Sequence, residues 1–149
     1  MTQPNADGNP SLEVHVTAKA KYGDTAVLAT DIVLSGNITP PAEAWRLAVT
    51  EICQHSPSSQ KNGSPKGAFL GLCEAGLIKA IPAGSYSKSV HNQAKGYALR
   101  AFSLLSSDPA LAGDRKTLWQ KVMDGKVKRH NGQMDVVLAL WQHGLLQSS

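Results

Sequence analysis

One segment, Lys61-Asn62-Gly63-Ser64-Pro65-Lys66, has the composition of an anion-binding helix start. Glycine near a helix start lets backbone N–H groups approach an anion, and the helix dipole favours negative charge there. Lys61, Ser64 and Lys66 would lie beside those N–H groups. The GxxxxGK[ST] spacing of a Walker A loop is absent, and so is the strand that precedes one. The segment therefore predicts a phosphate or carboxylate site of another kind; the alternative is an ordinary Ser-Pro helix cap with solvated lysines.

A second segment of this kind precedes the last expected helix. Lys128, Arg129 and His130 form a basic cluster, and Asn131-Gly132-Gln133 begins the helix with a side-chain cap at Asn131. The cluster is the best local candidate for contacts to a phosphate backbone, and the alternative is a solvated loop. The sequence leaves open whether the two helix starts converge or lie at opposite ends of the molecule.

The charge of the chain is uneven along its length. The net charge is +4, but three basic and six acidic residues precede residue 61, whereas twelve basic and five acidic residues follow from there. This asymmetry indicates an anionic partner for the C-terminal part, either a nucleic acid or a nucleotide. Helices that read base edges are dense in Arg, Asn, Gln and Ser, and this pattern is missing, so sequence-specific DNA reading is not favoured.

Catalytic patterns are weaker. Cys73 could combine with His130 and Asn131, but it lies late in an apolar helix, where a thiol is usually inert and packed in the core. The five histidines show no HxxxH or HExxH spacing, so neither a metal site nor a cofactor is predicted.

Asp135 is the most informative acid, because it lies on the most apolar helix. If it is buried, it should pair with a lysine or arginine or belong to a site. A polar pocket between the two halves of the chain, near Tyr86, Asn92, Asn131 and Asp135, would be the site of a small enzyme.

These residues must be positioned by helices. The 149-residue chain is one domain long, and its 42% hydrophobic but only 5% aromatic composition favours a core of Leu, Val, Ile and Ala. Cap, proline and glycine signals predict an all-α, six-helix compact domain, and the expected helix caps are Thr39, Ser64, Asp114 and Asn131. The expected helices cover about 19–34, 40–53, 64–75, 87–105, 115–123 and 132–143.

The chain ends and cysteines complete this picture. Residues 1–11 are expected to form a flexible N-terminal tail and 12–149 a single domain, in which 12–17 could be a short strand or a helix extension. No apolar run is long enough to span a bilayer, and residues 1–10 lack the charged-then-apolar layout of a signal peptide, so we expect a cytoplasmic protein without a membrane partner. Cys53 and Cys73 are expected to be buried thiols.

The six helices repeat in order. Gly76 and Gly144 end equivalent helices, and Trp45 and Trp119 lie in the middle of others. Further matches in the last helix of each half are Leu70 with Leu138, Leu72 with Leu140, and Leu77 with Leu145. This order predicts two three-helix repeats, at about 18–80 and 87–147, related by a pseudo-twofold axis.

Three segments carry a resemblance to a known family. They are SPKGAFLGLC at 64–73, IPAGSY at 81–86 and NGQMDVVLALW at 131–141. With them, the chain resembles a family of short bacterial proteins classed as a domain of unknown function, from about Tyr22 to Leu146. The resemblance implies one compact domain and assigns no activity, cofactor or catalytic residue.

The residue patterns favour a binding module over an enzyme. The first hypothesis is a non-enzymatic module for a phosphate-rich ligand, bound through Lys61, Lys66, Lys128 and Arg129. The second is a protein–protein interaction or regulatory (inhibitor) protein, and the third is the small enzyme. The oligomeric state stays open.

Overall fold

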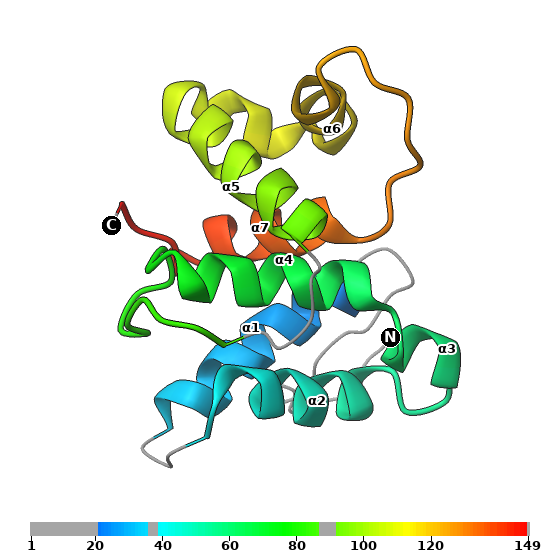
Figure 1. Ribbon diagram of the computed structural model, residues 1–149, viewed down its shortest axis with the longest axis vertical. Helices are drawn as coiled ribbons and strands as arrows, with labels where there is room; N and C mark the ends of the chain where they lie inside the picture. Colours follow the sequence, from blue (N-terminus) through cyan, green and yellow to red (C-terminus); the bar gives the residue numbers. More distant parts are fainter. Residues whose placement is uncertain (1–20, 36–38, 87–91, 149) are drawn as a thin grey trace, which may run out of the picture.

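The computed structural model describes residues 21–35, 39–86 and 92–148, and it is helical (Figure 1). The six longer helices are α1 (Lys21–Leu34), α2 (Pro41–Ile52), α4 (Gly63–Glu74), α5 (Asn92–Ser107), α6 (Arg115–Met123) and α7 (Gln133–Gln142). A four-residue helix, α3 (Pro57–Gln60), and a 3-10 helix, η1 (Pro109–Gly113), lie in the connections. The predicted all-α, six-helix fold is confirmed.

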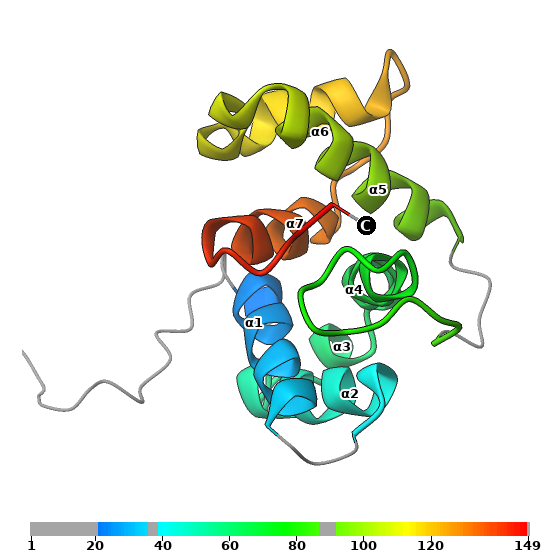
Figure 2. The ribbon, with the colours of Figure 1, turned by 90° about the vertical axis from the view of Figure 1, so that its left-hand side faces the viewer.

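Helices α4 and α7 lie at the centre of the molecule, with α1 and α2 on one side and α5 and α6 on the other (Figures 1 and 2). Each central helix packs against the first helix of the other half: α4 against α5, and α7 against α1. Within each half the first two helices also pack together. Neither half could therefore bury its third helix alone.

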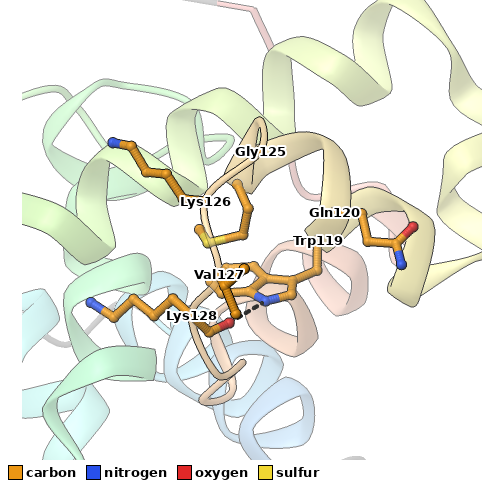
Figure 3. A pocket seen from close by; sticks show the side chains of 7 residues that line it. Trp119, Gln120, Gly125, Lys126, Val127 and Lys128 are labelled. Carbon is orange, nitrogen blue, oxygen red and sulfur yellow. Dashed lines mark hydrogen bonds between the residues drawn. The ribbon is translucent and has the colours of Figure 1, made fainter.

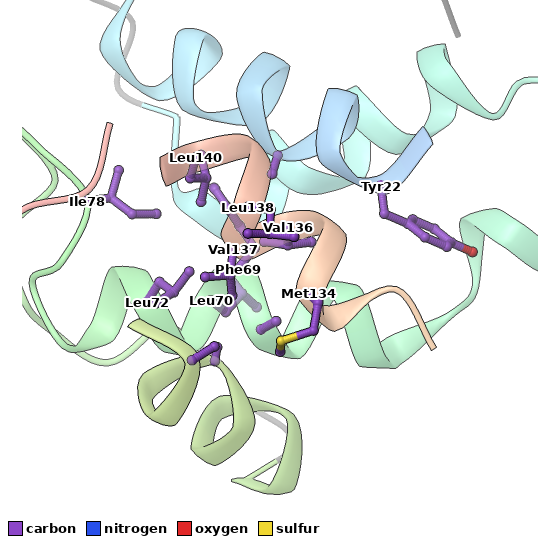
Figure 4. Close-up of a cluster of buried hydrophobic side chains, with 14 of the residues drawn as sticks. Tyr22, Phe69, Leu70, Leu72, Ile78, Met134, Val136, Val137, Leu138 and Leu140 are labelled. Carbon is purple, nitrogen blue, oxygen red and sulfur yellow. The ribbon is translucent and has the colours of Figure 1, made fainter. Parts of the chain in front are cut away.

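The central helices are apolar because they are enclosed. In α4, Phe69 and Leu72 are fully buried, and in α7, Val136, Val137 and Leu140 are fully buried (Figure 4). A helix that is apolar on most of its faces belongs in a core. Both cysteines are free and buried, as the sequence predicts. Within the described ranges, no helix has the length and hydropathy that crossing a bilayer requires.

The ends of α4 and α7 are tied together by their backbones. Gly76 and Gly144, the predicted stops, have φ of +75° and +69°, which favours glycine. Lys79, three residues after Gly76, donates its N–H to the carbonyl of Leu145, which directly follows Gly144. In the same way Gln147, three residues after Gly144, donates its N–H to the carbonyl of Leu77, which directly follows Gly76. Both distances are 2.8 Å. These bonds are reciprocal, as two equivalent turns facing each other would make. The duplication of the sequence stays a prediction.

The predicted helix starts need correction at three places. Pro40, not Thr39, stands at the cap position of α2, and no side chain caps that helix. Asn62, not Ser64, caps α4, because its Oδ1 accepts the N–H of Ser64 at 3.1 Å. Gly132, with φ of +86°, takes the cap position of α7 that was predicted for Asn131.

The other predicted start is confirmed, since Asp114 Oδ1 accepts the N–H of Thr117 at 3.0 Å and caps α6. The expected N-terminal tail (1–11), the expected strand or helix extension (12–17) and the first residues expected for the fourth helix (87–91) lie outside the described residues.

We expect Gly71→Ala to lower the free energy of unfolding by about 1–3 kcal/mol, because it overfills the contact between α4 and α5. A methyl group at Gly71 would lie 2.5 Å from Cγ and 2.8 Å from Cα of Lys95. Urea unfolding followed by circular dichroism measures the change.

Gly96→Ala in α5 is the matched control. A methyl group there meets no atom of the described residues within 4 Å, so alanine should stabilise the helix by about 0.5–1 kcal/mol. A Gly71→Ala variant as stable as Gly96→Ala would contradict the close packing of α4 on α5.

Candidate functional site

The starts of α4 and α7 converge, which answers the question that the sequence left open. The side-chain amides of Asn62 and Asn131 are paired: Asn62 Nδ2 donates to Asn131 Oδ1 at 2.8 Å, and Asn131 Nδ2 donates back to Asn62 Oδ1 at 3.2 Å. Asn131 Nδ2 also lies 3.2 Å from Ser64 Oγ. Three predicted site segments, at 61–66, 128–130 and 131–133, are thus brought to one end of the molecule.

Tyr22 of α1 contacts this amide pair, through Asn62, and the turn before α4. Its hydroxyl donates to the carbonyl of Ser59 at 3.3 Å and accepts a hydrogen bond from Asn62 Nδ2 at 3.2 Å. Its ring packs so closely on Gly132 that a methyl group there would lie 2.6 Å from the ring. Two independent constraints therefore favour glycine at residue 132: its positive φ and the close contact with the Tyr22 ring.

Five lysine and arginine residues lie within five positions of Asn62 or Asn131 in the sequence: Lys61, Lys66, Lys126, Lys128 and Arg129. All five are exposed, and none forms an ion pair with a carboxylate in the described part of the chain. Elsewhere, Lys95 pairs with Glu74 at 3.1 Å and Arg115 with Asp135 at 2.7 Å, whereas Lys79, Lys116 and Lys121 also lack a carboxylate partner in the described part of the chain. Five unpaired cations thus belong to the two segments around the helix starts. We call these five residues the basic end.

His130 has a structural contact. Its Nε2 accepts the backbone N–H of Met134 at 3.0 Å, so this nitrogen carries no proton and caps α7. The ring packs edge-to-face on Trp119 at 5.0 Å. Burial lowers the pKa of His130, while Asp135 acts to raise it and Arg115 to lower it.

Two other predicted site residues also have partners inside the fold. Gln133 is buried, and its Oε1 accepts the N–H of Asn131 at 2.9 Å, which holds the loop before α7. Asp135 forms the expected pair with an arginine, at Arg115.

The polar pocket predicted from Tyr86, Asn92, Asn131 and Asp135 is not assembled. Tyr86 lies beside the C-terminal end of α4, where its N–H donates to Glu74 Oε2 at 2.8 Å. Asn131 lies at the N-terminal end of the same helix. Asn92 begins α5, and its side chain lies outside the described part of the chain.

A different pocket was missed by the sequence. It holds about 400 Å³ between α1, α6 and α7, and its charged or polar lining comes from Asp24, Arg115, Asp135, Gln142 and His143. Asp24 Oδ2 is buried and has no hydrogen-bond partner among the described residues, and burial raises the pKa of this carboxyl. The packing of α1 against α7 creates this pocket, and the spacing of its lining residues in the sequence does not predict it.

Comparison with protein families assigns the chain to a family. A family of unknown function, DUF6979, matches residues 19–147. The chain belongs to this family. The match includes the whole of the resemblance drawn from the sequence, about Tyr22 to Leu146, and the family description assigns no activity. No curated protein and no solved structure matches the chain.

We expect Asn62→Ala and Asn131→Ala to be coupled in a double-mutant cycle by about 0.5–1.5 kcal/mol, because each substitution removes the same pair of hydrogen bonds. Urea unfolding of the two single variants and the double variant measures the coupling. The cycle of Asn62→Ala with Asp114→Ala, which removes the cap of a different helix, is the control and should be additive. Additive effects in the Asn62/Asn131 cycle would show that the amide pair contributes nothing to stability.

We expect the stability of the protein to fall as the pH is lowered below about 6.5, in part through His130. Its pKa is lowered in the folded state, so on acidification the unfolded chain takes up the proton first, and folding loses free energy until the folded pKa is passed. Protonation also removes the acceptor that caps Met134. Urea unfolding at pH 7.5 and at pH 5 should show the drop, because these values lie roughly one unit above and one and a half units below the usual histidine pKa.

His130→Ala should cost about 1 kcal/mol at pH 7.5, through the lost hydrogen bond, and should make the drop smaller. His55→Ala, at an exposed position, should keep the wild-type drop. A His130→Ala variant with an unchanged pH dependence would contradict the assigned cap.

Proposed function

We propose that this chain is a non-enzymatic module that binds a phosphate-rich ligand, a nucleic acid or nucleotide, at the basic end. The observation that carries the proposal is the pairing of Asn62 with Asn131, which joins two basic segments far apart in the sequence. Like charges repel, so a chain that gathers unpaired cations at one place gains nothing in stability from doing so. An anionic ligand would offset that repulsion.

The chemistry of the basic end suits phosphate. Lysine and arginine neutralise phosphate oxygens, and helix starts contribute a partial positive charge in the same place. This arrangement suits a ligand that carries several negative charges.

A non-enzymatic role is supported by the state of Cys73, the one nucleophile that the sequence singled out. It is fully buried in α4, and burial raises the pKa of its thiol well above the usual value. Such a thiol stays protonated and unreactive at neutral pH.

We expect the double variant Lys66→Ala/Arg129→Ala to weaken binding of labelled mixed-sequence oligonucleotides roughly tenfold and to reduce the slope of log affinity against log salt by about two. Fluorescence anisotropy between 20 and 200 mM NaCl, roughly the range in which counterion release dominates, measures both values. The cause is the loss of two phosphate contacts.

Lys79→Ala/Lys116→Ala is the matched control. It removes the same number of positive charges from exposed positions that are outside the basic end, so it should leave the salt slope nearly unchanged. Equal losses in both double variants would mean that net charge alone drives binding. At about 20 mM salt, charges are only weakly screened. If no oligonucleotide binds under this condition, the proposal is wrong and a protein partner is favoured.

A further inference from the structure

A surface pocket of about 440 Å³ lies where the loop after α6 folds back over that helix (Figure 3). Its volume is within the roughly 300–1,000 Å³ of small-molecule sites. The loop 125–128 forms one wall, and α6 forms the other. The lining residues are Trp119, Gln120, Met123, Gly125, Lys126, Val127 and Lys128.

The pocket combines an aromatic ring with positive charge. Trp119 and Met123 supply apolar surface from α6, and Val127 on the loop is fully exposed. Lys126 and Lys128 extend from the loop in the same direction, on either side of Val127 (Figure 3). Both lysines belong to the basic end and lack a carboxylate partner in the described ranges. Lys128 Nζ donates to Gln93 Oε1 and lies 5.5 Å from the centroid of the Tyr97 ring, so a phosphate would replace the hydrogen bond to Gln93. A fully exposed valine between two lysines is not explained by the packing of the fold.

The indole of Trp119 is held in place. Its Nε1 donates to the carbonyl of Lys128 at 3.1 Å, which fixes the loop to the ring. Tyr97 and His130 pack edge-to-face against it, with centroids 5.4 and 5.0 Å away. The ring therefore loses little conformational freedom when a ligand packs against it.

We propose that this pocket takes a base of a single-stranded nucleic acid, packed against Trp119, while Lys126 and Lys128 contact the phosphates on either side. The inference rests on the proposed function and names its ligand class. Aromatic rings beside cationic side chains are the usual means of binding single strands without sequence preference. The bases of a duplex are already paired and stacked, so a duplex can reach only the lysines.

The test compares four ligands of equal length: a mixed-sequence DNA strand, an RNA strand, an abasic deoxyribose-phosphate strand and a DNA duplex. Anisotropy at fixed salt should give the two base-bearing strands at least roughly fivefold higher affinity than the abasic strand, the gain expected from stacking one base. The Trp119→Leu variant should lose this gain and keep the affinity for the abasic strand. The abasic strand thus reports whether the variant is folded and still carries its basic end.

Tryptophan fluorescence gives a second readout. The base-bearing strand should quench the emission of the wild type, and Trp119→Phe should remove this quenching, since Trp45 is buried in the core and the half-buried Trp141 does not line the pocket.

The outcomes separate this inference from the proposed function. Equal affinity for the base-bearing and abasic strands, with wild-type salt dependence, would overturn the base pocket and leave phosphate binding intact. Tighter binding of the duplex than of the single strand would also overturn it. Failure of all four ligands to bind would overturn the proposed function itself.

Discussion

The contact between α4 and α7 is the constraint on which the rest of the structure depends. Both helices are apolar on most of their surface, so each must be covered by the other and by one helix from the opposite half. Because α4 packs on α5 and α7 packs on α1, neither half of the chain has a closed core by itself. The basic end is a consequence of it, because placing the two helices side by side also places their starts side by side.

Hydrogen bonds at both ends then fix the register of the two helices. At one end the backbones beyond Gly76 and Gly144 exchange two bonds, and at the other the amides of Asn62 and Asn131 do so. Apolar packing tolerates small sliding motions, whereas these bonds have narrow geometric limits. The position of the two basic segments relative to each other is therefore set by the core and its two ends together.

The sequence predicted well those features that local chemistry determines. Glycine at positive φ explains the ends at Gly76 and Gly144, and Asp114 caps α6 as its spacing indicates. The starts of α4 and α7 were placed close to their true positions, but the capping groups were wrong. A run such as Asn62-Gly63-Ser64 offers two side chains of similar capping strength, and the choice depends on Asn131 and Tyr22, which are distant in the sequence.

The candidate site was predictable in its residues and not in its arrangement. Lys61, Lys66, Lys128 and Arg129 follow from charge and helix-start signals, and the structure gathers them at one end. Tyr86 was misplaced because its loop folds back on Glu74 at the far end of α4. The pockets at Trp119 and Asp24 depend on how α6 and α1 meet other elements, and such tertiary contacts leave no periodic signal in a single sequence.

The central claim is that the basic end is the surface that meets the ligand. Amide chemical-shift mapping on ¹⁵N-labelled protein, titrated with a mixed-sequence DNA strand at low salt, tests this most directly. The largest shifts should fall on residues 61–66 and 125–132, and added salt should reverse them. Shifts concentrated around Asp24 and His143, or around 76–86 at the opposite end of α4, would contradict this claim.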